Sequence, residues 1–176
     1  MRLQRAKQYR KHLRFFKIVF GITEPYQMLL DGNFVHICLS KKFNVADRLT
    51  KLLQGSRIAI CTTRCIIAEL ESLGETCRPA LEFVTKFCKM VHCGHMTCLS
   101  AANCISILVG ESNDKKYMVA SQDADLRAHM RSVPGVPIVY ANPTILILEP
   151  PSKMSMSDSR KVRHFMLFFI GAGGGD

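Results

Sequence analysis

The sequence contains no long apolar run and no apolar stretch of the kind that directs secretion. Its longest uninterrupted apolar run, residues 165–170, has six residues, whereas a membrane-spanning helix needs about 20. The first residues, Met1-Arg2-Leu3-Gln4-Arg5, continue into a polar segment instead of the apolar core of a signal peptide. We therefore expect a soluble protein of a reducing intracellular compartment, with no membrane partner.

Acidic residues are also scarce. The chain of 176 residues has 14 Asp and Glu against 24 Lys and Arg, which gives a formal net charge of +10 and a pI near 9.4. This balance favours polyanionic partners, of which nucleic acid is the first candidate, over a small-molecule substrate. The 48% hydrophobic content is enough for one ordinary domain with a core of its own.

The shortage of acids is most pronounced at the N-terminus, where none precedes Glu24. Residues 1–23 form a predicted basic arm, with too few apolar residues to bury a face of its own and with helix formers that favour a helix docked on a partner. Its cations, suited to RNA phosphates, are Arg2, Arg5, Lys7, Arg10, Lys11, Arg14 and Lys17. We expect the basic surface to be extended by Lys115, Lys116, Arg127 and Arg131.

Residues 24–150 alternate short apolar runs with helical patterns, which predicts an α/β domain around a mainly parallel central sheet flanked by helices. The predicted strands are residues 28–31, 57–61, Tyr117–Ala120, 137–140 and 144–148. The predicted helices are residues 45–54, a helix capped by Thr62 or Thr63 that runs to Gly74, Arg78–Phe87 and residues 123–131. Beyond Pro150-Pro151 the composition shifts to Ser, Lys, Met and Gly, and we expect residues 151–176 to be a disordered tail.

Three carboxylates lie where the strands of a parallel sheet end. Asp31 closes the first predicted strand, Asp123 follows the strand Tyr117–Ala120, and Glu69 lies on the helix after the second strand. Ligands bind at this edge of such sheets, and clustered carboxylates hold Mg²⁺ or Mn²⁺, which activates water in a nuclease. Spacing alone favours ordinary structural roles instead: Asp123 as a helix N-cap, Asp31 in a turn and Glu69 on a solvated helix face.

The cysteines gather in one segment. Residues 88–104 contain four of the eight cysteines, Cys88, Cys93, Cys98 and Cys104, together with His92 and His95. In a reducing compartment this density of thiolate and imidazole favours tetrahedral Zn²⁺ over disulfides, although the spacing is not that of a standard zinc finger. We predict a small zinc-binding insertion that directs Lys86, Lys89 and His92 towards RNA; the alternative is a loop with buried thiols. Cys38, Cys61 and Cys77 are treated as ordinary residues.

Four ordered blocks of the sequence resemble a known family. They are Glu24-Pro25-Tyr26-Gln27-Met28-Leu29-Leu30-Asp31, Cys61-Thr62-Thr63-Arg64-Cys65-Ile66-Ile67-Ala68-Glu69-Leu70, Val119-Ala120-Ser121-Gln122-Asp123-Ala124-Asp125-Leu126 and Val133-Pro134-Gly135-Val136-Pro137. They are similar to PIN-domain proteins of the eukaryotic small-subunit processome, in particular the rRNA-processing Utp23 family, whose sister is the Fcf1 family. The resemblance implies a PIN-like fold and a nucleolar factor that acts in early pre-ribosomal RNA cleavage and binds or releases a small nucleolar RNA among other processome proteins.

The resemblance gives the acidic residues specific places. A PIN centre has four acidic positions, of which Asp31 matches the first, Glu69 the second and Asp123 the fourth. The third lies just before Cys104, where the sister branch has adjacent acids and this chain has Ala102-Asn103; Gly32 also stands where the family has a small hydroxylated residue. Loss of one carboxylate weakens binding of Mg²⁺ or Mn²⁺, so we expect a non-catalytic, RNA-binding ribosome biogenesis factor. An active metal-dependent endoribonuclease is the alternative.

The resemblance also bears on the zinc ligands. The Utp23 branch has a Cys-x-His pair followed by a distant Cys, which matches Cys93, His95 and Cys104. For the fourth ligand we choose Cys65, which matches a cysteine at the start of a family helix, over the local Cys88; Cys98 is a weaker candidate. A closed Cys₃His set leaves no open position, so the expected Zn²⁺ is structural.

Overall fold

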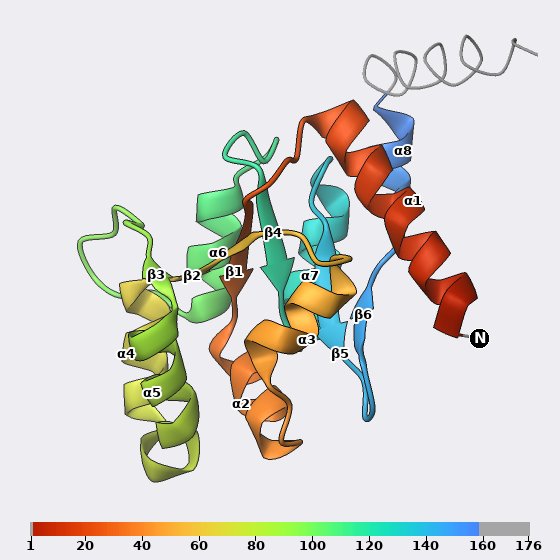
Figure 1. Ribbon diagram of the computed structural model, residues 1–176. Helices are drawn as coiled ribbons and strands as arrows, with labels where there is room; N and C mark the ends of the chain where they lie inside the picture. The colour runs from red at the N-terminus through yellow and green to blue at the C-terminus, as the bar shows by residue number, and fades with distance from the viewer. Residues whose placement is uncertain (1, 159–176) are drawn as a thin grey trace, which may run out of the picture.

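A six-stranded sheet forms the centre of the protein in the computed structural model, which describes residues 2–158 (Figure 1). The strand order is β3-β2-β1-β4-β5-β6, and all neighbours pair in parallel except β5 and β6, which are antiparallel. The strands are β1 (Tyr26–Leu30), β2 (Ile58–Thr62), β3 (Lys89–Met90), β4 (Tyr117–Ala120), β5 (Ile138–Ala141) and β6 (Leu146–Leu148). The predicted α/β class with a mainly parallel sheet is confirmed.

Helices cover both faces of this sheet (Figure 1). One face carries α2 (Gly32–Ser40), α3 (Val45–Leu52), α4 (Arg64–Ser72) and α5 (Arg78–Phe87), with a 3₁₀ turn, η1 (Gly74–Cys77), between the last two. The opposite face carries α6 (Ala101–Val109) and α7 (Ala124–Ser132). This division follows from right-handed crossovers, because the chain steps one way from β1 to β3 and then returns across the sheet to β4 and β5.

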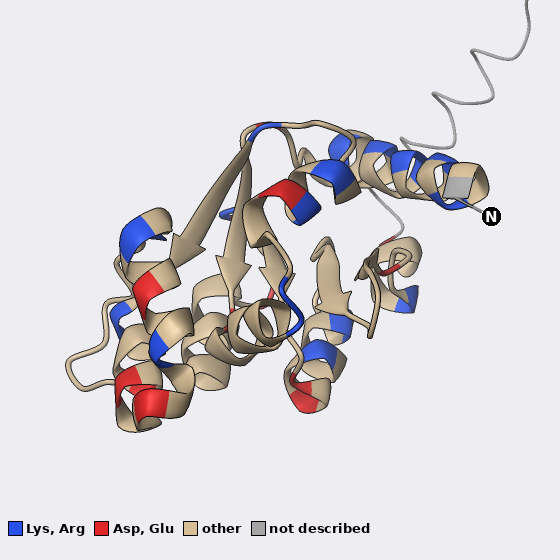
Figure 2. Ribbon diagram, turned by 60° about the horizontal axis from the view of Figure 1, so that its bottom comes forward, with Lys and Arg blue, Asp and Glu red and all other residues tan. Residues whose placement is uncertain are grey.

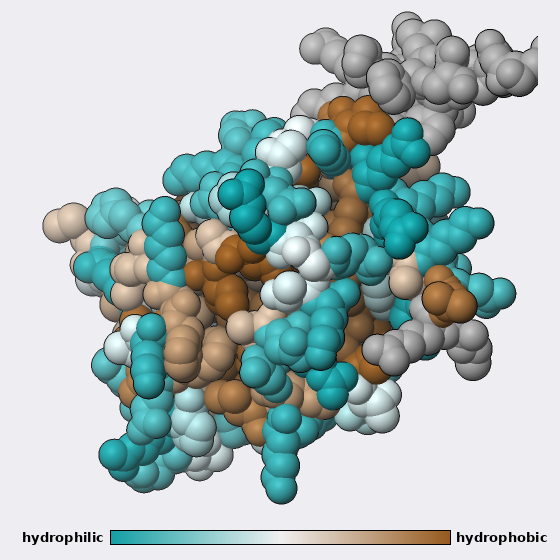
Figure 3. Space-filling model, in the orientation of Figure 1, coloured by the Kyte–Doolittle hydropathy of each residue, from teal (hydrophilic) through white to brown (hydrophobic). Residues whose placement is uncertain are grey.

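The core is centred on the two middle strands. All four residues of β4 are buried, as are all but Gln27 in β1, as expected of strands covered on both faces. The first three residues of β2 are only half-buried. Figure 3 shows hydrophobic surface near the middle of the face that carries α3 and α5, so the coverage of the sheet is incomplete on this side.

The basic N-terminal segment forms the expected helix, but it buries an apolar face of its own on the domain, and this part of the prediction is wrong. Residues Arg2–Phe20 form one helix, α1, and its aromatic and aliphatic side chains belong to the domain core. The buried residues are Tyr9, Leu13, Phe15, Phe16, Val19 and Phe20. Phe20 packs so closely on Gly135 that its ring leaves no room for a Cβ at this glycine. The apolar residues are few, but helical spacing places enough of them on one face to dock α1 on the domain.

Part of the predicted disordered tail is also ordered. Residues Lys153–Ser157 form a short helix, α8, capped by Ser152. The buried hydroxyl of Ser155 accepts a hydrogen bond of 3.0 Å from the backbone N–H of Gly135, which ties α8 to the same turn that receives α1. The rest of the predicted tail, residues 159–176, lies outside the described residues.

The predicted insertion at residues 88–104 is built into the fold at both ends. It begins with β3, which pairs in parallel with β2 at the edge of the sheet, and it ends inside α6. Within it, Cys88 and residues 91–100 lie outside regular structure. Within residues 2–158 no helix is both long and apolar enough to cross a bilayer.

Candidate metal centre and acidic site

The carboxyl edge of the parallel sheet carries the residues of both predicted sites. Asp31 follows β1, Asp123 follows β4, and the chain passes from β2 through Thr63 into α4, which carries Cys65 and Glu69. Since β1 lies between β2 and β4, these segments are neighbours in space. The topology therefore places the acids beside the cysteine-rich segment.

Asp31 is the most buried of the three acids, with 4% of its surface exposed. Its carboxylate accepts a hydrogen bond of 2.7 Å from the Ser121 hydroxyl. Burial raises the pKa of Asp31, and repulsion from Glu69 and Asp123 adds to the rise, while hydrogen bonds from Ser121 and from the backbone N–H of Asn33 act to lower it. These electrostatic interactions show that the three carboxylates share one region.

Asp123 has a capping role. One of its carboxylate oxygens accepts hydrogen bonds from the backbone N–H groups of Asp125 and Leu126, at 2.8 and 3.1 Å, so it caps α7. Its own N–H donates to the Ser121 hydroxyl at 3.0 Å. Ser121 thus joins Asp31 and Asp123, a role that our sequence reasoning missed although the residue lies in one of the four family-like blocks.

Glu69 faces the start of α6. Its carboxylate accepts a hydrogen bond of 2.7 Å from the backbone N–H of Ala101. The first turn of α6 has no acidic residue, and it holds Ala102 and Asn103, where the third acid of a PIN centre is expected. Among the described residues, no three acids have carboxylate oxygens that all lie within 4.8 Å of one another.

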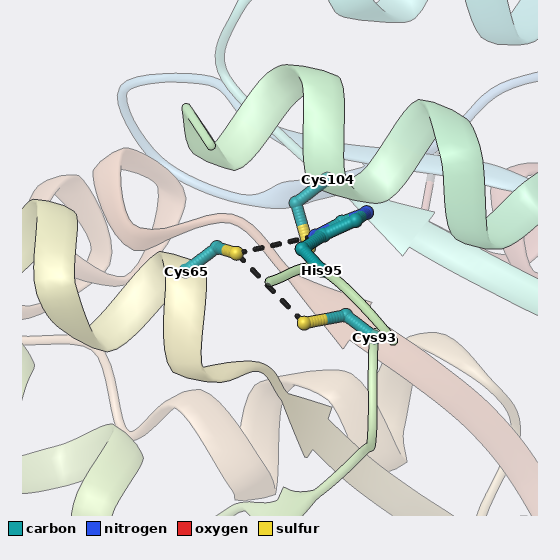
Figure 4. A group of neighbouring side chains, drawn as sticks. All are labelled: Cys65, Cys93, His95 and Cys104. Atoms are coloured by element: carbon teal, nitrogen blue, oxygen red, sulfur yellow. Dashed lines mark hydrogen bonds between the residues drawn. The ribbon is translucent and has the colours of Figure 1, made fainter. Parts of the chain in front are cut away.

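Four predicted zinc ligands come together beside this edge. The ligand atoms of Cys65, Cys93, His95 and Cys104 all lie within 4.8 Å of one another. Figure 4 shows that they converge from three parts of the fold, with Cys65 on α4, Cys104 on α6, and Cys93 and His95 on the loop between β3 and α6. Gly94 adopts a left-handed φ of 72°, which lets the loop turn so that both of its neighbours face the same point.

Two of the distances within this cluster match tetrahedral coordination. Bonds of about 2.3 Å to sulfur and about 2.05 Å to nitrogen place two tetrahedral sulfurs about 3.8 Å apart, and a sulfur and a nitrogen about 3.5 Å apart. The Sγ atoms of Cys65 and Cys93 are 3.8 Å apart, and Sγ of Cys65 is 3.4 Å from Nδ1 of His95. With all four ligand atoms within 4.8 Å of one another, the cluster could therefore hold a metal ion.

Further hydrogen bonds orient the thiols from outside the cluster. The backbone N–H of Leu99 donates to Sγ of Cys65 at 3.4 Å, and the Thr63 hydroxyl lies 3.3 Å from Sγ of Cys104. The same hydroxyl accepts the capping hydrogen bond from the N–H of Ile66. Such outer contacts fix the direction of metal ligands.

The thiols of the cluster differ in acidity. Burial raises the pKa of Cys104 to about 12 and also raises that of Cys65. Burial acts in the same direction on Cys93, but hydrogen bonds from the backbone of His95 and from neighbouring side chains outweigh it and lower the pKa of Cys93. A cation is the natural partner for buried sulfur that must be deprotonated to act as a ligand.

The other two candidate cysteines lie elsewhere. Cys88 is half-buried beside Cys61, and burial, with the nearby Cys61 thiol, raises its pKa to about 12. Cys98 is exposed. Neither belongs to the group of four. The buried Cys38 and Cys61 lie in the core, as does Cys77, whose Sγ is 3.9 Å from Nδ1 of His36.

The predicted RNA-contacting residues divide into two sets. The α1 cations from Arg5 to Lys17 are exposed, as are Lys86, Lys89 and His92 near the cluster, and Lys115. Arg131 instead forms a two-pronged ion pair with Glu149, with both N–O distances 2.8 Å, and Arg127 lies 4.5 Å over the ring of Tyr140. These two arginines have partners within the domain, but Arg131 is still exposed, and the extension of the basic surface through them stays a prediction.

The comparisons with known proteins agree with this geometry. The sequence profile of the Fcf1 family matches residues 51–150, more than half of the chain. The chain belongs to the Fcf1 family. The resemblance that the four sequence blocks indicate is thus confirmed.

Relatives of this Fcf1-family chain are named for rRNA processing. The rRNA-processing protein utp23 of Schizosaccharomyces pombe is 36% identical over 159 residues, which cover 89% of this chain and 60% of that protein. The rRNA-processing protein FCF1 of Saccharomyces cerevisiae is 32% identical over 139 residues, or 77% of this chain and 70% of that protein. The chain thus spans less than two thirds of the length of the fission-yeast relative.

A solved structure extends the likeness to the fold. The structure described as that of the PIN domain endonuclease Utp24 superposes with a TM-score of 0.66 and 32% sequence identity, over 73% of this chain and 94% of that chain. The protein therefore has the PIN fold, the architecture of a nuclease.

Proposed function

We propose that this chain is a non-catalytic, RNA-binding ribosome biogenesis factor of the small-subunit processome, active in pre-rRNA processing in the nucleolus. The names of its relatives support the process. Its proposed partners are pre-rRNA, a small nucleolar RNA that it binds or releases, and other processome proteins.

The observation that carries the non-catalytic assignment is the first turn of α6. This turn abuts Glu69 through the N–H of Ala101 and has no acidic residue. A divalent ion at the sheet edge then has three carboxylates instead of four, and each of them already accepts a hydrogen bond: Asp31 from Ser121, Glu69 from Ala101, and Asp123 from the N-terminus of α7. Fewer charges weaken binding of Mg²⁺ or Mn²⁺ and the electrostatic stabilisation of phosphate hydrolysis.

Gly32 supports the same assignment. A Cβ at this position would lie 2.9 Å from the side chain of Leu70, so Leu70 occupies the space that a hydroxylated residue beside Asp31 needs. An apolar side chain of α4 therefore stands at the edge of the acidic site where the family has a hydroxyl group.

We assign a structural Zn²⁺ to Cys65, Cys93, His95 and Cys104. The tetrahedral distances and the three cysteine ligands support zinc over Mg²⁺ or Mn²⁺, which prefer oxygen. Four protein ligands leave no position for water or RNA. The ion would fasten the loop at residues 91–100 to α4 and α6, beside the exposed Lys86 and Lys89.

The test compares binding with cleavage. We expect the purified chain to bind a structured pre-rRNA fragment with an affinity that falls steeply with salt, since phosphate contacts release counterions. Asp31→Asn should leave this affinity unchanged, and no cleavage should appear with excess Mn²⁺. Salt-independent binding, or the absence of binding, would count against the proposal.

The second candidate is a Mn²⁺-dependent endoribonuclease, favoured by the three acids that remain together around Asp31. It requires cleavage of the same fragment in Mn²⁺ that Asp123→Asn abolishes. Cleavage that survives this substitution points to a contaminating nuclease, and Mn²⁺-dependent cleavage that it removes would replace our proposal.

A further inference from the structure

A groove lies between α1 and the start of the sheet, away from both sites described above. It has a volume of about 480 Å³. One wall is formed by α1, and the other by the turn that follows α3 and by Tyr26, the first residue of β1.

The α1 wall is cationic. Arg10, Arg14 and Lys17 line it at spacings of four and three residues, so they lie on one face of the helix and span about 10 Å of its axis. None of the described residues that line the groove is acidic. Glu24, which interacts with Lys17, accepts a hydrogen bond of 2.9 Å from the backbone N–H of Arg57 and lies 3.9 Å from its side chain.

The floor and the opposite wall differ in chemistry from the α1 wall. Apolar side chains of Leu13, Ile18 and Leu53 form the floor, while the amide of Gln54 and the hydroxyl of Ser56 supply polar groups. A cationic wall suits phosphate, an apolar floor suits a base or ribose face, and an amide can recognise a base edge.

A second, smaller groove of about 190 Å³ continues this surface. Arg5, Arg48 and Lys51 line it, and Gln54 lines both grooves. Lys51 pairs with Asp47 at 2.7 Å and Arg48 lies 4.4 Å over the ring of Phe43, so Arg5 is its cation on α1. Figure 2 shows Lys and Arg repeated along α1. From Lys17 to Arg5 the helix rises about 18 Å, a length that accommodates several nucleotides.

We propose that these two grooves form a binding site for single-stranded RNA, with phosphates on the α1 cations and an unstacked nucleotide against the apolar floor. The inference rests on the RNA binding of the proposed function and specifies its site. A concave, partly apolar groove favours a single strand, because a duplex keeps its bases stacked inside and offers mainly phosphates and ribose hydroxyls.

The site lies at the opposite end of the sheet from the acidic residues. Tyr26 begins β1 at the groove, whereas Asp31 follows its other end, and five residues of strand span about 16 Å. RNA held in the groove is thus separated from the acids, so binding is expected to be independent of the acidic site.

The test measures fluorescence anisotropy of a labelled oligouridylate of about 12 nucleotides with two charge-matched variants. Arg10→Ala/Lys17→Ala removes two groove cations, and Lys7→Ala/Lys11→Ala removes two from the same helix outside the residues that line the grooves. Each lost phosphate contact lowers the salt slope by about 0.7 for single strands. Loss of two contacts therefore lowers the slope by about 1.4. The affinity of the variant relative to wild type should then be about 25-fold lower at 0.1 M salt than it is at 1 M salt. We expect this loss for the groove variant and a severalfold smaller loss for its match.

The variant Gln54→Ala tests the groove without a change in net charge. We expect it to weaken binding of the oligouridylate with an unchanged salt slope, and duplex RNA of equal length to bind more weakly than the single strand. Equal losses in the two charge variants, or preference for the duplex, would overturn the groove site while leaving RNA binding intact. No binding of either RNA by the wild-type chain would remove the proposed function as well.

Discussion

Replacement of Cys93 by Ser tests the metal centre most directly. Cys93, Cys65 and Cys104 are buried and come from a loop and two helices, so an ion bound by them cross-links three parts of the fold. Serine keeps the size of the side chain but removes the thiolate. We expect zinc content to fall from about one per chain to near zero in the variant.

The loss of the ion has a calculable effect on stability. If free zinc exceeds the dissociation constant a thousandfold, binding stabilises the folded state by about 4 kcal/mol. A domain of this size shifts its Tm by about 2–4 °C per kcal/mol. Thermal denaturation should therefore show a Tm lowered by roughly 8–16 °C in the Cys93→Ser variant, and a similar decrease when a chelator removes zinc from the wild-type protein.

Two cysteines provide matched controls. Cys98→Ser alters an exposed residue of the same loop, and Cys38→Ser alters a buried thiol outside the cluster. We expect both to retain zinc, although Cys38→Ser should lower the Tm through its buried hydroxyl. The reasoning is refuted if wild-type protein carries no zinc by elemental analysis, or if Cys98→Ser loses as much zinc as Cys93→Ser.

Two further predictions concern the acids and α1. The folded-state pKa of Asp31 is raised, so its stabilising contribution is complete below its ordinary pKa and is lost as pH rises through the folded value. Asp31→Asn should thus raise the Tm by a few degrees at pH 7 without added Mg²⁺ or Mn²⁺. The difference in Tm between variant and wild type should shrink towards pH 4, and a difference that stays the same across this range contradicts the burial argument. Phe16→Ala, at a side chain 1% exposed, should cost about 3–5 kcal/mol in chemical denaturation, whereas Leu3→Ala on the same helix, 87% exposed, should stay within about 0.5 kcal/mol. Equal effects of the two would mean that α1 does not dock on the domain.

The parts of the fold that sequence predicts well have local boundary signals. Two elements, Arg78–Phe87 and Tyr117–Ala120, have the predicted ends. Pro79 fixes the first turn of α5, and a charged turn in which Asn113 and Lys116 have positive φ precedes β4. Thr63, one of two predicted caps, accepts the hydrogen bond that begins α4.

The elements that sequence patterns miss depend on tertiary packing. The patterns above predict neither α2 nor α6. In α6, apolar and β-branched residues occur on several faces, since the helix packs against both α4 and α7, and no amphipathic period marks it. In α1 the charged residues dominate the sequence pattern, and this pattern does not reveal the aromatic face that the domain buries.

The candidate sites show the same division. Residue chemistry and family resemblance together select the four cysteine and histidine residues that the structure brings within 4.8 Å, and their binding of zinc stays a prediction. No local pattern indicates that Ser121 joins two acids or that Leu70 fills the space beside Gly32, because both depend on how α4 and β4 lie relative to β1.

The beginning of α6 links the two sites. Within its first turn, the N–H of Ala101 binds Glu69, and Cys104 directs its sulfur into the cysteine cluster. A metal that fixes Cys104 therefore also fixes the position of the turn that lacks the third acid. The dependence between the two sites therefore runs in one direction. Removal of zinc should loosen Glu69 and its neighbours, whereas substitution of the acids should leave zinc content unchanged. Zinc content measured in Asp31→Asn and Asp123→Asn would show whether the cluster is independent of the acids, as a structural role requires.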